Sequence, residues 1–259
     1  MPLLDHFRPP MTDIVDWETF HAAWAHETMR HLHEAVLPPR YAARTFVHFG
    51  RQIEVDVAAV ENSPNAEPGR AGSNGHGGAA VLAAPAIYTP PSPPLSAVAT
   101  VAAEGQVEIQ VRKNVGGWKL VAAIELVSES NKDRPAHRRA FAIKCASYLQ
   151  AGVAVVVVDT VTSYRAELHA ELTGLLRLPE VFDWESPTGL SAVSYRTVEG
   201  LGDAALQTGD GRVRLDVWPF PLAVGAELPT VPLWLAADLA VPLELELTYA
   251  AACKSLRLG

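Results

Sequence analysis

Cysteine is scarce in this chain, which has only Cys145 and Cys253 among its 259 residues. Two cysteines cannot build a disulfide scaffold or a cysteine-based zinc site, and they favour a reducing, cytoplasmic setting. Long hydrophobic runs are missing as well, because the longest aliphatic stretch, residues 154–158 with their neighbours, is far short of the ~20 residues that span a bilayer. The N-terminus lacks the basic start and apolar run of a secretory signal. We therefore expect a cytoplasmic protein without a membrane segment.

Basic side chains are fewer than acidic ones. The chain has 21 basic and 29 acidic side chains, which gives a formal net charge of −8. Residues 1–150 carry 14 basic and 15 acidic groups, a net of −1, and the remainder carries 7 and 14, a net of −7. This balance argues against avid, non-specific binding of nucleic acid. One basic cluster, with only Asp133 as a local acid, could still receive an anion: Lys132, Arg134, Arg138, Arg139 and Lys144.

Hydrophobic residues are abundant, at 49%, while charged residues make up 19%, so the chain can form a full core. Its length suits a single domain over residues 1–259. Residues 62–94 are rich in glycine and proline, which predicts a flexible insertion.

The hydrophobic pattern predicts an α/β fold, a mixed sheet with helices on both faces and additional strands near the C-terminus. Asp16 can cap a first helix that Pro38 ends. The predicted order of strand 119–127, helix 136–150 and strand 153–159 indicates a βαβ unit. The last of these strands is nearly all β-branched, which is typical of a strand buried on both faces of a parallel or mixed sheet. The predicted helices are 17–37, 136–150 and 164–176, and the predicted strands are 45–49, 52–60, 106–112, 119–127, 153–159, 191–197 and 212–218, followed by apolar segments to 247–258.

Three charged residues stand out by their positions. Asp56 and Glu125 lie within predicted core strands, and Lys144 lies on the helix that follows Glu125. A carboxylate in a core strand is costly unless it is paired or binds a metal. Two carboxylates on adjacent strands can hold Mg²⁺ or Mn²⁺, and a nearby lysine can offset the charge of a phosphate. The alternatives are a structural ion pair between Glu125 and Lys144, or a Glu125 side chain that points to solvent.

Residues 124–132, 144–153 and 156–159 resemble the core of the Uma-two-like nucleases, which belong to the restriction-endonuclease-like, or PD-(D/E)XK, superfamily. The whole chain is still more similar to a bacterial family of domains of unknown function with that core. The first helix, the segment Leu-Pro-Pro-Arg-Tyr at 37–41 and the segment 232–234 contribute to this likeness. The resemblance implies a restriction-endonuclease-like sheet and a magnesium-dependent endonuclease that acts on DNA.

By position, the resemblance makes Asp56 the first acid of the signature, Glu125 the second, and both of them metal ligands. Val127 stands where the signature usually has lysine. In the related nucleases this lysine has moved to the next helix, which matches Lys144 and leaves Lys132 as the second candidate. Lys132, Arg138 and Arg139 are the expected substrate contacts. DNA is the expected partner, with a homodimer also allowed.

Other polar groups have simpler interpretations. The first helix carries His21, His26, His31 and His33, whose spacings of five, five and two do not give the i, i+4 pair of a helical zinc site, so we interpret them as solvated. Glu27 or Glu34 on the same helix could add a third carboxylate to a metal.

A second function stays open beside the nuclease. A non-catalytic member of the same fold could serve as a binding or assembly module. The net charge of −8 and the acidic C-terminal half favour this alternative, whereas the pattern of two acids and a lysine favours the enzyme.

Overall fold

The computed structural model describes the chain except for residues 50–52, 63–87, 101–117, 199–211 and 259. The predicted strand 106–112 and most of the predicted insertion 62–94 lie outside the described residues. The helices are α1 (Trp17–His31), α2 (Glu129–Lys132), α3 (Pro135–Gln150), α4 (Leu168–Leu175) and α5 (Leu245–Ser255), with a π-helical turn at Leu32–Val36 and 3₁₀ turns at Met11–Asp13 and Glu180–Phe182. The strands are β1 (Tyr41–Phe49), β2 (Ile53–Asn62), β3 (Leu95–Thr100), β4 (Trp118–Leu126), β5 (Ala154–Asp159), β6 (Leu190–Val198), β7 (Arg212–Leu222), β8 (Thr230–Ala236) and β9 (Leu239–Glu244).

Helix α1 begins where the sequence indicates. The Asp16 carboxylate accepts the Thr19 N–H at 2.8 Å and so satisfies one of the free amides of the first turn. Phe20 and Trp24, four residues apart, are fully buried on the side that faces the sheet. The π-helical turn follows α1 directly, and the two together confirm the predicted helix 17–37 to within a residue.

Seven strands form the main sheet in the order β1-β2-β4-β5-β6-β7-β3. β4 and β5 run parallel, and the other described pairings in this sheet are antiparallel. β8 and β9 form a separate antiparallel hairpin. The expected mixed sheet with additional C-terminal strands is confirmed.

The parallel pair is built by the crossover from β4 through α2 and α3 to β5. Pro135 starts α3, where the proline lacks an amide that would have had no helical partner anyway. Gly152, just beyond α3, adopts a φ of +71°, which a side chain would strain. Every residue of β5 is buried, as expected for a central strand. The predicted βαβ unit is confirmed.

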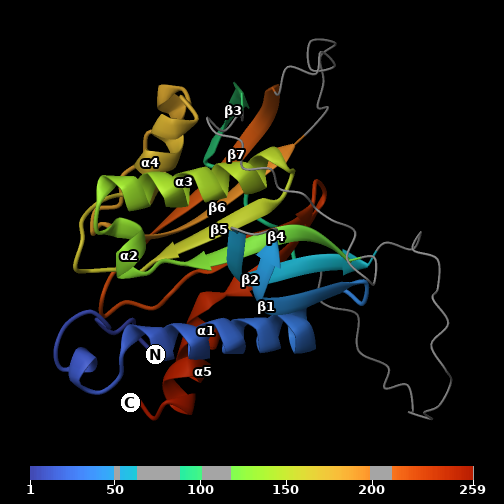
Figure 1. The fold of residues 1–259 in the computed structure, drawn as a ribbon. Coiled ribbons are helices and arrows are strands. Elements are labelled where there is room, and N and C mark those ends of the chain that lie inside the picture. The colour runs from blue at the N-terminus through green and yellow to red at the C-terminus, as the bar shows by residue number, and fades with distance from the viewer. Residues whose placement is uncertain (50–52, 63–87, 101–117, 199–211, 259) are drawn as a thin grey trace, which may run out of the picture.

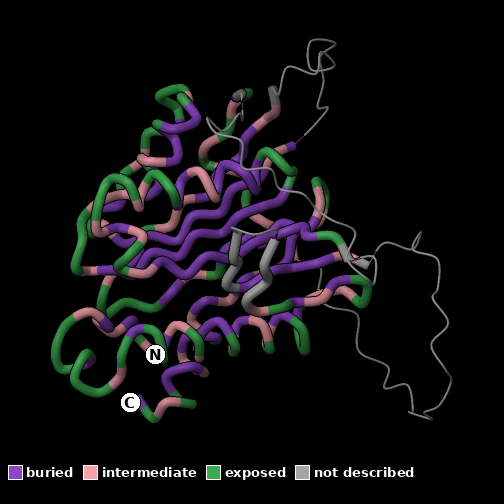
Figure 2. Tube along the Cα trace, viewed as in Figure 1, coloured by how far each residue is buried: buried purple, intermediate pink, exposed green. Residues whose placement is uncertain are grey.

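Helices cover both faces of the sheet (Figure 1). α1, α5 and the β8–β9 hairpin pack on one face, and α3 and α4 pack on the other. Neighbouring residues of β4 alternate between these two cores, with Ile124 in the first and Ala123 in the second. The strands in the middle of the sheet are accordingly buried along most of their length (Figure 2). No helix within the described ranges is long and apolar enough to cross a membrane.

Three elements differ from the sequence prediction. α4 begins at Leu168, four residues after the predicted start at Tyr164, which is exposed. Strand β3, which pairs with β7, directly follows the predicted insertion 62–94 and is not among the predicted strands. The apolar C-terminal segment forms helix α5.

The segment before α1 closes over the α1–α5 side of the core. The His6 ring stacks on Phe20, with ring centres 3.7 Å apart, and its Nε2 is hydrogen-bonded to the Tyr249 hydroxyl at 2.8 Å. His6 is only 3% exposed. Burial lowers the pKa of His6 to about 4, because the charged imidazolium would lose its hydration there.

The His6 environment predicts loss of stability in mild acid. Between pH 6.5 and 4 the unfolded chain binds a proton that folded His6 resists, so the free energy of unfolding falls as the pH is lowered through this window. From these two pKa values the loss between pH 7 and pH 5 is about 2 kcal/mol. The variant His6→Phe should be less stable than the wild type at pH 7. Its free energy of unfolding should fall less between pH 7 and pH 5 than that of the wild type. Urea titrations at both pH values measure this, and equal losses in both proteins would contradict it.

Candidate active site

A cavity of about 480 Å³ opens beside the carboxyl end of β4, between α1 and the α2–α3 segment. Its size lies in the range of small-molecule sites, roughly 300–1,000 Å³. Its wall combines charged, hydroxyl, amide and aromatic groups: Trp17, Glu18, His21, Ala22, Glu125, Leu126, Ser128, Ser130, Asn131 and Lys144. Two of the predicted catalytic residues, Glu125 and Lys144, therefore share one cavity.

Glu125 and Lys144 form an ion pair in the wall of this cavity. The Lys144 ammonium donates to Oε2 of Glu125 at 2.6 Å. The Glu125 side chain is only 2% exposed, whereas that of Lys144 is 24% exposed. The carboxylate of the pair is thus buried, the lysine side chain is partly exposed, and the alternative in which Glu125 points to solvent is excluded.

Asp56 belongs to β2, next to β4, but its side chain lies outside the described residues. Val57 pairs with Ile124 in the antiparallel register of these strands. Asp56 precedes Val57 and Glu125 follows Ile124. Because the strands are antiparallel, continuing this register places Asp56 opposite Glu125. The convergence of their carboxylates on one cation stays a prediction.

Helix α1 contributes Glu18, which the sequence analysis did not name, and His21, which it interpreted as solvated. Glu18 and His21 line the cavity from its first turns. His21 donates from Nε2 to the Leu126 carbonyl oxygen at 3.2 Å and is half-buried, so its interpretation as a solvated histidine is wrong. Their spacing could have indicated that they act together, because residues three apart are neighbours on one helix face. Both also lie in the first turns after the N-cap Asp16.

The other acids and histidines of this helix lie away from the cavity. Glu27 and Glu34 both accept hydrogen bonds from Arg30, at 2.6 Å and 2.9 Å, and neither lines the cavity. His26 and His33 are exposed, in agreement with their interpretation as solvated. His31 is hydrogen-bonded to Glu244 at 2.8 Å.

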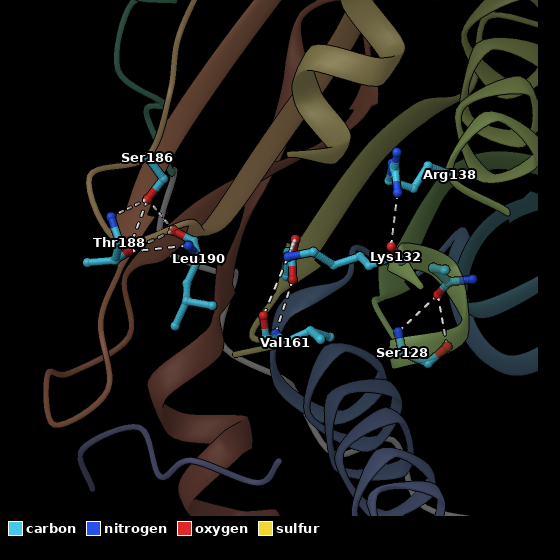
Figure 3. Close-up of polar contacts among 9 residues, drawn as sticks. Ser128, Lys132, Arg138, Val161, Ser186, Thr188 and Leu190 are labelled. Carbon is cyan, nitrogen blue, oxygen red and sulfur yellow. Dashed lines mark hydrogen bonds and ion pairs between the residues drawn. The ribbon is translucent and has the colours of Figure 1, made fainter. Parts of the chain in front are cut away.

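Lys132 does not reach a surface where a substrate could lie, contrary to expectation. Its side chain is 0% exposed, and its ammonium lies 2.8 Å from Asp159 Oδ2 and 3.4 Å from the Val161 carbonyl oxygen. Figure 3 shows the Lys132 side chain extending from α2 toward Val161. Burial raises the pKa of the Asp159 carboxyl to about 6, and the Lys132 ammonium opposes that rise. Lys132 is thus a buried structural partner, because Asp159 needs a counter-charge in the core.

Arg138 and Arg139 line a different depression, about 390 Å³ in volume, between α3 and α4. The same depression holds Glu167 and Glu171, and Nε of Arg138 donates to Glu171 at 2.9 Å. A second guanidinium nitrogen of Arg138 donates to the Lys132 carbonyl oxygen, as seen in Figure 3. The structure therefore does not bring these arginines together with Glu125 and Lys144.

The buried thiols offer no alternative chemistry at this site. Cys145, adjacent to Lys144 in α3, is buried, and burial raises the pKa of its thiol far above the ordinary value. Burial also raises the pKa of Cys253. Because the thiolate is the reactive form, neither cysteine is a nucleophile at neutral pH.

A metal ion at this cavity would need carboxylate ligands. The described part of the chain contains no group of three or more His, Cys, Asp or Glu side chains arranged to hold a metal ion. Mg²⁺ needs fewer protein ligands, because it keeps several waters and takes one or two carboxylates. Glu125, with Asp56 as the predicted second ligand, fits that requirement.

Comparison with known proteins finds no matching family model, no matching curated protein and no matching solved structure.

The two buried lysine–carboxylate pairs should respond differently to loss of the lysine. Lys132→Met leaves Asp159 in a closed core, so the free energy of unfolding should fall by about 3–5 kcal/mol. Lys144→Met leaves Glu125 beside an open cavity that admits water, so a smaller loss of about 1–3 kcal/mol is expected. Chemical denaturation at pH 7 measures both. If Lys144→Met costs as much as Lys132→Met, the Lys144–Glu125 pair is mainly structural.

Proposed function

We propose that the cavity at the end of β4 hydrolyses phosphodiester bonds in DNA with Mg²⁺ or Mn²⁺. The observation that carries this proposal is the Lys144–Glu125 pair, a buried carboxylate and a part-exposed ammonium 2.6 Å apart in the wall of an open cavity. This pair avoids part of the desolvation cost that the fully buried Lys132–Asp159 pair incurs, and it leaves the Lys144 side chain within reach of a ligand in the cavity.

Glu125 and Asp56 would hold the metal ion. A bound divalent cation lowers the pKa of its water and polarises a phosphoryl oxygen, and so supplies the nucleophile for hydrolysis. Glu125 is held in place because β4 is central to the sheet and Lys144 fixes its carboxylate from α3. Such rigid support is what a site needs to keep its ligands in a productive geometry.

Lys144 would act on the substrate. Its side chain is the part of the pair that solvent reaches and it lines the cavity, so a phosphate there can approach it. A fixed positive charge beside the reacting phosphate stabilises the negative charge that grows in the transition state. His21 lines the same cavity, and an imidazole can take or give a proton near neutral pH.

The second candidate function is a non-catalytic binding or assembly module. The acidic net charge of −8 favours it, as does the fact that Lys144 is already paired with a carboxylate. In this case the pair would be a structural feature of the cavity wall.

Cleavage assays with the full chain separate the two functions. The wild type should cleave DNA in the presence of Mg²⁺ or Mn²⁺ and lose this activity with EDTA. Glu125→Gln and Lys144→Met should each lower the rate by roughly 10²–10³-fold, the effect typical of removing one group that stabilises transition-state charge. Lys254→Met, on the exposed side of α5, is the matched control and should keep the wild-type rate.

Melting curves of the same variants complete the experiment. A variant that is folded at the assay temperature but inactive supports the enzyme. A wild type that cleaves no single-stranded, duplex or branched DNA with either metal would reject hydrolysis and favour the binding module.

A further inference from the structure

The charges around the cavity are unusual for a protein that holds duplex DNA. Its described wall carries two carboxylates, Glu18 and Glu125, and one ammonium, that of Lys144. The ammonium lies 2.6 Å from one of these carboxylates. A phosphate in the cavity would therefore meet a local charge near zero or slightly negative, without counting a metal ion.

Several arginines elsewhere on the described surface are also paired with local acids. Arg30 pairs with Glu27 and Glu34, and Arg138 pairs with Glu171. Arginines that form ion pairs with carboxylates in the described residues include Arg8, Arg30, Arg40, Arg134, Arg138, Arg196 and Arg214. A protein that tracks a duplex usually neutralises several phosphates with free Lys and Arg side chains. The described wall of the cavity has no such row, because Lys144 is its one Lys or Arg side chain.

Neutral hydrogen-bonding groups form another part of the cavity wall. The hydroxyls of Ser128 and Ser130 lie 2.8 Å apart, and the Asn131 side chain, whose Oδ1 accepts from the Ser128 N–H and hydroxyl, lines the cavity from the same segment. Ser130 is exposed. Hydroxyl and amide side chains contact phosphate and sugar oxygens without adding charge. The volume of about 480 Å³ suits one small ligand rather than a length of double helix.

We infer that the substrate unit of this site is a single phosphodiester at an unpaired nucleotide, in a dinucleotide or a single-stranded end, and that duplex DNA is not its substrate. This inference rests on the proposed hydrolysis and specifies what is hydrolysed. Recognition comes from the Ser128–Asn131 segment and Lys144 at one phosphate, so neighbouring phosphates add little to affinity.

The experiment compares a thymidine dinucleotide, a single-stranded oligonucleotide and its duplex, each with the full chain and Mg²⁺, over a range of salt concentrations. The dinucleotide and the single strand should have kcat/KM values within about tenfold of each other, and the duplex should react at least about tenfold more slowly. On a log–log plot against salt, a single phosphate contact gives a slope of about −0.7 to −0.9, whereas six or more give about −4 or steeper. A duplex that reacts fastest, or the steeper slope, would overturn the inference.

Two variants test where the phosphate lies. Ser130→Glu places a negative charge on the exposed rim of the cavity and should lower kcat/KM for the dinucleotide by at least about tenfold, because like charges repel. Ala170→Glu places the same charge in the other depression, beside Arg138 and Arg139, and should leave the rate unchanged. The reverse pattern would assign substrate binding to the depression between α3 and α4 and reject the inference.

Binding measurements separate this inference from the proposed function. If the wild type cleaves none of the three substrates, calorimetry with the dinucleotide and Mg²⁺ still tests the cavity. Binding that Ser130→Glu weakens and Ala170→Glu preserves would support the ligand class and reject the hydrolysis. No binding of the dinucleotide would reject both.

Discussion

Two carboxylates at the carboxyl ends of the parallel strands must be kept in the core, and this constraint organises the centre of the molecule. Glu125 comes near the end of β4, and Asp159 ends β5. The connection between these strands supplies a lysine to each, Lys144 to Glu125 and Lys132 to Asp159. Because a buried carboxylate without a partner is strongly destabilising, the path of the α2–α3 crossover is fixed by both pairs.

The two pairs differ in their access to water, and that difference separates structure from function. Lys132 and Asp159 are closed off, and the Val161 N–H also donates to Asp159, so this pair joins α2 to the segment after β5. That junction supports the wall formed by Ser128, Ser130 and Asn131. The Lys144–Glu125 pair lies beside that wall, where its ammonium meets the cavity. The buried pair thus supports the site, and the open pair belongs to it.

A third buried charge connects the main sheet to the C-terminal hairpin. Asp216 in β7 is fully buried and accepts hydrogen bonds from Ser96, Arg196 and Arg214. Burial opposes its ionisation, but these donors lower the pKa of Asp216 below its ordinary value. The Arg196 guanidinium lies 3.5 Å from the centre of the Trp234 ring in β8. The cation therefore packs the hairpin onto the sheet on the face that α1 and α5 also cover.

The sequence by itself determined the helical and strand periods, the parallel pair and the candidacy of Glu125 and Lys144, because these follow from local patterns of burial and from the cost of a charge in a core strand. It could not determine that Lys132 is buried or that Arg138 and Arg139 lie elsewhere, since a cluster in sequence says nothing about which helix face meets which acid. The acids that pair with Lys132 and Arg138 are Asp159 and Glu171, which lie 27 and 33 residues further along the chain. The presence of Glu18 and His21 in the cavity wall likewise depends on contacts between segments that are distant in sequence. Only the packing of α1 beside the end of β4 places them there, and such contacts between distant segments exist only in the folded chain.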